Sequence, residues 1–82
     1  MKKNQTVELL AQQAWDEGVA KKGMYAVERA NDTLVLSLRK KTLAQFRVTG
    51  YQQGVIEHSQ ASTEAQKIAV DTFLNYFQGT HA

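Results

Sequence analysis

The 82-residue chain contains no cysteine and no proline. Without cysteine it forms no disulfide and offers no thiolate to a metal ion, which fits a reducing compartment. Without proline, no slow X–Pro isomerisation delays its folding. No apolar run approaches the length of a membrane span, and the basic start at Met1–Lys3 is not followed by the apolar segment of a signal peptide. We therefore expect a cytoplasmic protein with no membrane association.

The chain also has little excess charge of either sign. Ten lysines and arginines against eight acidic residues leave a net charge of +2, a weak preference for anionic partners that falls well short of a dedicated nucleic-acid binder. The length and an ordinary apolar share of 43% predict one domain over residues 1–82. We expect residues 1–4 and 79–82 to fray. A domain this small has little material for both a core and a deep catalytic cleft.

A helix is predicted from about Asn4 to Glu17. Apolar residues recur there with helical spacing, at Val7, Leu10, Ala11, Ala14 and Trp15. Asn4 or Thr6 can cap its start, and Gly18 can supply a left-handed residue at its end. The alternative is a longer helix that continues through 19–22 and ends at Gly23. We favour the shorter helix, with 19–22 as a frayed extension, because an internal glycine costs about 1 kcal/mol relative to alanine.

A second helix begins after Thr63. Thr63 and Gln66 have the spacing of a capping box, and Glu64 suits the first turn. A broad apolar face follows, formed by Ala65, Ile68, Ala69, Phe73, Tyr76 and Phe77 and extended by Val70 and Leu74. Gly79 is the expected C-terminal cap.

Between the helices, from Met24 to His58, the apolar period is two, which is typical of strands. Asn31–Asp32 suits a tight hairpin turn. Lys40–Lys41 marks a second turn, for which we expect a slightly longer loop or a bulge. The segment Gly50–Gly54 is either a loop or a bulged continuation into 55–58, so the number of strands is three or four.

These elements predict an α+β fold with two layers: a helix, a three- or four-stranded antiparallel β-meander, and a helix, with both helices packed on one sheet face. The large apolar residues expected to meet in the core are Trp15, Leu34, Leu36, Leu38, Phe46, Ile68, Phe73 and Phe77. The other face is expected to be exposed or to meet a partner. A mixed patch is predicted on it, formed by Tyr25, Val27, Val35 and Leu43 with Arg39 and Arg47 beside them.

No arrangement of residues indicates catalysis. The eight carboxylates are scattered over predicted helix surfaces, turns and strands. His58 and His81 are isolated and lack the spaced ligands of a zinc site. Gly50 and Gly54 do not form a phosphate loop, because no lysine and no helix follow them. We predict no catalytic residue, no metal ligand and no cofactor, and hence a protein that is not an enzyme.

The basic residues form the most suggestive pattern. Arg39, Lys40 and Lys41 lie together at a predicted hairpin tip, with Arg47 on the following strand. Two further lysine pairs are Lys2–Lys3 and Lys21–Lys22. One interpretation is a basic rim that grips phosphates or an acidic protein surface. The other is a set of solubilising charges that protect loops and sheet edges from aggregation.

The order helix, three strands, helix resembles the double-stranded-RNA-binding domain. In that family the last helix starts with several lysines that reach phosphates. The corresponding stretch here, 62–67, contains only Lys67 together with the acidic Glu64. The family's Gly-Pro-x-His type of loop is also missing, since the chain has no proline. The resemblance therefore extends to topology and does not bring RNA binding with it.

The sequence hypothesis is a small non-enzymatic interaction protein that binds stoichiometrically to a larger protein or complex, such as an inhibitor or regulator encoded by a phage or mobile element. The predicted partner-binding residues are Tyr25, Arg39, Lys40, Lys41 and Arg47. The alternative is a weak nucleic-acid-binding domain that uses the same basic rim. A homodimer through the outer face or an exposed edge strand is a third hypothesis.

Overall fold

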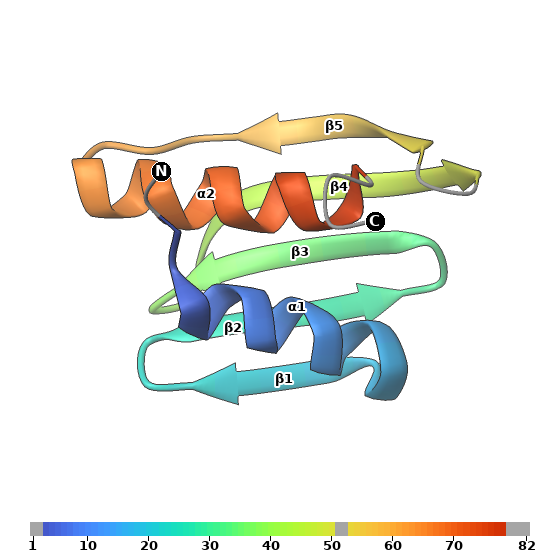
Figure 1. Cartoon of the computed structure of the whole chain (residues 1–82), viewed down its shortest axis with the longest axis horizontal. Coiled ribbons are helices and arrows are strands. Elements are labelled where there is room, and N and C mark those ends of the chain that lie inside the picture. The colour runs from blue at the N-terminus through green and yellow to red at the C-terminus, as the bar shows by residue number, and fades with distance from the viewer. Residues whose placement is uncertain (1–2, 51–52, 79–82) are drawn as a thin grey trace.

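The computed structural model describes residues 3–50 and 53–78. The elements follow in the order α1 (Gln5–Glu17), β1 (Val19–Lys22), β2 (Tyr25–Ala30), β3 (Thr33–Leu38), β4 (Lys41–Gly50), β5 (Gln53–Ser59) and α2 (Glu64–Phe77). The strands form one sheet, and both helices lie on the same face of it (Figure 1). The predicted α+β class and its two layers are confirmed.

The sheet is an antiparallel meander with the spatial order β1-β2-β3-β4-β5. The sheet has one strand more than the three or four predicted, and the strand that the prediction missed is β1. The predicted alternative of a bulged continuation from Gly50–Gly54 into 55–58 is confirmed as β5. Gly18 ends α1 in the left-handed conformation, with φ at 94°, and the chain turns directly into β1 instead of fraying over 19–22. At the other end, shifts in register let 53–59 pair with β4 as a full strand.

The predicted mixed patch on the outer sheet face was also wrong. Val27 pairs with Leu36, so Val27 lies on the same face as the core leucines and is fully buried. A β-bulge opposite Leu36 and Ser37 inserts Leu43 as an extra residue in β4, which turns both Leu43 and Ala44 inward. Strict alternation of inward and outward side chains along β4 does not predict that Leu43 points inward.

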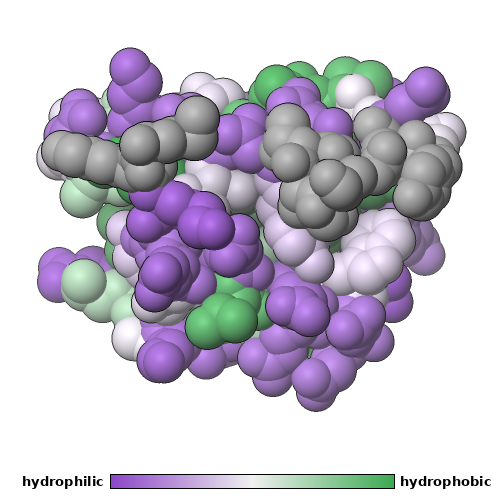
Figure 2. Space-filling view, viewed as in Figure 1, coloured by the Kyte–Doolittle hydropathy of each residue, from purple (hydrophilic) through white to green (hydrophobic). Residues whose placement is uncertain are grey.

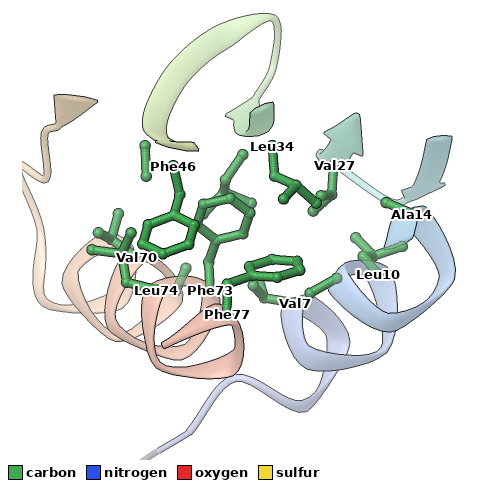
Figure 3. Close-up of a cluster of buried hydrophobic side chains, with 14 of the residues drawn as sticks. Val7, Leu10, Ala14, Val27, Leu34, Phe46, Val70, Phe73, Leu74 and Phe77 are labelled. Carbon is green, nitrogen blue, oxygen red and sulfur yellow. The ribbon is translucent and has the colours of Figure 1, made fainter. Parts of the chain in front are cut away.

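The core lies between the sheet and the two helices, and its largest fully buried side chains are Phe46 and Phe73 (Figure 3). Phe77 joins them, with ring centroids 6.2 Å from Phe46 and 5.2 Å from Phe73. Trp15, expected in the core, is instead 41% exposed. Its ring contacts Phe77 on one side, and the Arg29 guanidinium lies 5.3 Å from its centroid. Of the other predicted core residues, Leu38 and Ile68 are only partly buried.

The two helices are tied together at the start of α1. The Asn4 side chain caps the helix by accepting a hydrogen bond from the Val7 N–H at 3.1 Å. The Asn4 N–H donates to the Thr72 hydroxyl of α2 at 3.0 Å. Two hydrogen bonds therefore hold Asn4 in place, and the fraying predicted for residues 1–4 stays a prediction. Residues 1–2 and 79–82, including the predicted cap at Gly79, lie outside the described residues.

The start of α2 follows the predicted capping pattern. The Thr63 hydroxyl accepts a hydrogen bond from the Gln66 N–H at 3.1 Å. The Gln66 side chain reaches back one residue further than a standard capping box, since its oxygen accepts from the Ser62 N–H at 2.9 Å. These hydrogen bonds satisfy backbone N–H groups at the start of α2.

Candidate interaction surface

Two hairpin turns meet at one end of the sheet, on the left in Figure 1. The turn from β1 to β2 contains Gly23 and Met24, and the turn from β3 to β4 contains Arg39 and Lys40. The Arg39 N–H donates to the Met24 carbonyl oxygen at 2.9 Å. The Arg39 side chain also donates through Nε to the Met24 sulfur at 2.8 Å. These bonds hold the two turns together as one surface.

The second of these turns has an unusual backbone. Arg39 and Lys40 have φ values of 51° and 69°, so both are in the left-handed region. Two consecutive residues with positive φ are the signature of a tight primed hairpin turn, for which Asn-Gly is the preferred sequence. Of the two predicted alternatives, the longer loop was wrong, because arginine and lysine adopt the strained conformation of a two-residue turn. Each contributes a strain of about 1–2 kcal/mol. The predicted bulge is present, at Leu43 shortly after the turn.

The cationic side chains of both turns gather at this end. Lys21 and Lys22 belong to β1, Arg39 and Lys40 to the second turn, and Lys41 to the first position of β4. We call these five residues the basic end. Across 3–50 and 53–78, the ion pairs are Lys3 with Glu8 at 3.0 Å and Arg47 with Glu57 at 3.2 Å. Within the described residues, none of the five cations of the basic end forms an ion pair.

An open hollow of about 530 Å³ lies at the basic end. Its lining residues are Lys21, Gly23, Met24, Tyr25, Ala26, Glu28, Ser37, Arg39 and Lys40. Three of them are cationic and one is acidic, so the hollow is electropositive. Met24 contributes an apolar side chain that is 51% exposed. The combination offers charge and a flexible apolar contact in the same place.

The structure brings together three of the five residues predicted for partner binding, namely Arg39, Lys40 and Lys41. Tyr25 borders the hollow, but its side chain lies on the helix side of the sheet and packs against the core. Arg47 is six residues beyond Lys41 along β4, about 20 Å away at strand spacing. It lies on the uncovered sheet face, paired with Glu57, and is not part of this surface.

The binding-site prediction left out Lys21, Lys22 and Met24, although the lysine pair had been noted as a basic cluster. A meander brings alternate turns to the same end of a sheet, so the first and third turns are neighbours. Applying that rule requires the strand at 19–22, where the sequence predicts a frayed helix extension.

Side chains that could bind a metal ion are not clustered in the described chain. Within 3–50 and 53–78, no group of three or more histidine, aspartate and glutamate side chains could hold a metal ion. Burial raises the pKa of the Tyr76 hydroxyl above its ordinary value, and the carboxylates of Asp16 and Glu8 add to the rise. Tyr76 lies near the end of α2 with its ring against Phe77, far from the hollow.

The helices in the described part of the chain are not long and apolar enough to cross a membrane. Comparison with known proteins yields no relative: no family model, no curated protein and no solved structure matches this chain. The proposed function therefore rests on the surface chemistry of the molecule.

Proposed function

We propose that this chain is a small non-enzymatic interaction protein that binds stoichiometrically, through its basic end, to an acidic surface on a larger protein or complex. The observation that carries the proposal is the gathering, at two neighbouring turns and the strand ends beside them, of five cations that form no ion pair within the described residues. A surface of this kind attracts an acidic partner over several ångströms and orients it before contact. An inhibitor or regulator would act by occupying that partner's surface.

The strained turn supports a binding role for its two residues. Solubility alone does not explain arginine and lysine at two left-handed positions, because charges elsewhere on the surface would provide it without strain. Unfavourable backbone conformations occur preferentially at functional sites, where the side chain's position matters more than stability. Here the strain directs Arg39 and Lys40 outward at the tip of the molecule, beside Met24.

A protein partner fits this surface better than a nucleic acid does. Proteins that bind single strands stack bases on exposed aromatic rings. The one aromatic residue at the basic end, Tyr25, is packed against the core. Tyr51, the other candidate from the sequence, lies outside the described residues. Arginine and methionine are enriched in protein interfaces, and the hollow places Arg39 against Met24. Nucleic-acid binding is the competing hypothesis, and the positive charge is the one feature that supports it.

The test is affinity capture from a bacterial lysate, with and without nuclease, followed by mass spectrometry and titration of the captured partner. We expect a protein that is retained after nuclease treatment. The double variant Lys40→Glu/Lys41→Glu should weaken its binding at least about tenfold. A matched control, Lys3→Glu/Lys67→Glu, makes the same change in net charge away from the hollow and should bind almost normally.

Three results would contradict the proposal. Recovery of nucleic acid alone, lost with nuclease, would favour the competing hypothesis. Equal weakening by both double variants would show that net charge matters and the basic end does not. An empty capture would leave the basic end as a device for solubility.

A second variant separates binding from folding. Replacement of the strained turn by Arg39→Asn/Lys40→Gly supplies the residues that a primed turn prefers. We expect the free energy of unfolding to rise by about 1–2 kcal/mol, while partner binding falls because two cations are lost. A variant that is more stable and binds less well cannot owe its weak binding to misfolding.

A further inference from the structure

β5 is an exposed edge strand. It is the last strand of the sheet, and within 3–50 and 53–78 no other strand pairs with its outer edge. Six of its seven residues are exposed, and only Gly54 is partly buried. Val55 and Ile56 are each 45% exposed. Figure 2 shows hydrophobic side chains along the edge of the molecule where β5 lies. Unpaired backbone groups beside exposed aliphatic residues form a template for another strand.

The two aliphatic side chains lie on opposite faces of the sheet. Ile56 pairs with Phe46 and so lies on the helix side, while Val55 pairs with Arg47 and lies on the uncovered face. A strand added to this edge would therefore cover apolar surface on both faces. Lysine, the usual protection of an edge strand, is absent from 53–59.

The charges near β5 complement a second copy of the same strand. With a two-fold axis at Ile56, the centre of the strand, Ile56 lies opposite Ile56 of the partner subunit. Val55 then lies opposite Glu57 of the partner subunit. Arg47 is the neighbour of Val55 in β4, so it lies two strand spacings, about 10 Å, from that carboxylate on the same face. Both long side chains span this distance together, and the contact occurs twice.

Other arrangements are less favourable. A two-fold axis at Glu57 would place two carboxylates opposite each other. Pairing through the other edge, β1, would bring together Lys21 and Lys22 of both copies. The self-complementary register is therefore specific to β5.

We propose that β5 pairs antiparallel with β5 of a second copy of this chain, and that the two sheets join into one ten-stranded sheet with a two-fold axis at Ile56. The interface is small, and β5 carries two shifts in its register with β4. Association is therefore weak, with a dissociation constant in the micromolar to sub-millimolar range. The proposal does not depend on the basic end, and its test requires no other partner.

Cysteine cross-linking tests the geometry directly, because the natural chain has no thiol. Opposed residues in an antiparallel pair have Cα atoms about 4.5–5.5 Å apart, within the range of a disulfide. We expect Ile56→Cys to form a disulfide-linked dimer rapidly under mild oxidation. Val19→Cys is the matched control, since Val19 is an aliphatic residue on the other edge strand and is 48% exposed. Equal cross-linking rates for the two variants would overturn the proposal.

Sedimentation equilibrium of the full chain tests association without oxidation. We expect a monomer–dimer equilibrium that Val55→Lys weakens by at least about tenfold, while Val19→Lys leaves it unchanged. Circular dichroism should show both variants folded, because both side chains are exposed. A wild-type chain that stays monomeric up to millimolar concentration would overturn the proposal and leave β5 as an edge for a different protein's strand. Equal effects of the two lysine substitutions would place the interface elsewhere.

Discussion

The two edge strands of the sheet have opposite characters. β1 has four residues and carries a lysine on each face, with Lys21 on the uncovered side and Lys22 on the helix side. β5 has seven residues and carries an aliphatic side chain on each face, Val55 and Ile56. Short length and charge are the usual means by which proteins prevent edge-to-edge pairing. The comparison shows that this protein protects one edge and leaves the other open to a second strand.

The lysines of β1 also bear on the two interpretations of the basic residues, edge protection and a binding surface. Lys21 lies on the edge strand and also lines the electropositive hollow. The two interpretations are therefore compatible, because the hairpin turn places the end of the edge strand beside the turn from β3 to β4.

The edges also differ in how the helices support them. α1 packs on β1 and β2, where Ala20 is buried. α2 packs on β4 and β5. The Phe46 ring lies directly over Gly54, in the space that any other side chain would need. The close packing of β5 against Phe46 therefore requires glycine at position 54.

The largest predicted effect comes from filling that space. In Gly54→Ala, the new Cβ would overlap the Phe46 ring and the Arg47 carbonyl. We expect the free energy of unfolding to fall by about 1–3 kcal/mol and Tm to fall by roughly 5–20 °C in thermal denaturation. Hydrogen exchange should show loss of protection in β5 before β1.

Gly50→Ala is the control for this substitution. Its Cβ would meet only the flexible Gln53 side chain, at 3.4 Å. We expect a change within about 0.5 kcal/mol. Similar losses in both variants would show that flexibility of the strand ends, and not the close approach of Phe46, requires the glycine.

A smaller effect is expected from removing the charges that protect β1. In a Val55→Lys background, where association through β5 is blocked, Lys21→Val/Lys22→Ile should restore concentration-dependent association of about the wild-type strength, now through β1. Sedimentation equilibrium measures this association. Faster cross-linking after addition of Val19→Cys to the same variant locates it at β1. If the triple variant stays monomeric, and addition of Val19→Cys to it gives no faster cross-linking, then the shortness of β1, and not its lysines, protects that edge.

The smallest effect is expected at the ionic contact on the β5 side. Glu57 pairs with Arg47 at 3.2 Å and accepts a hydrogen bond from Gln45 at 3.1 Å, near the surface. Glu57→Gln should change the free energy of unfolding by less than about 0.5 kcal/mol, since exposed ion pairs contribute little. It should nevertheless weaken dimerisation several-fold, because the carboxylate also faces the partner subunit. Urea denaturation and sedimentation measure the two quantities.

Glu8→Gln serves as the control. It removes the other described ion pair, which joins Glu8 of α1 to Lys3 just before the helix. Its effect on unfolding should be similarly small, and dimerisation should be unchanged. If Glu57→Gln also leaves dimerisation unchanged, the charge complementarity at β5 has no role.

Part of the candidate surface was predictable from the sequence. Arg39, Lys40 and Lys41 are adjacent in the chain, so their grouping needed no tertiary information. Arg47 was assigned to the same surface because it lies on the next strand, but position along that strand separates it from the turn. Lys21 and Met24 were missed because their proximity to Arg39 arises from strand pairing between segments 15 or more residues apart.

Local chemistry in the sequence determined the helices, their caps, the two-layer class and the leucine face of β3, because these depend on contacts between residues a few positions apart. Asn4 and Thr63 cap the helices as their side chains predict. Only the tertiary structure decided the number of strands, the inward turn of Leu43 and the exposure of Trp15. Each depends on register between distant strands or on the helix packed above them, and a single bulge reverses the face to which a side chain points.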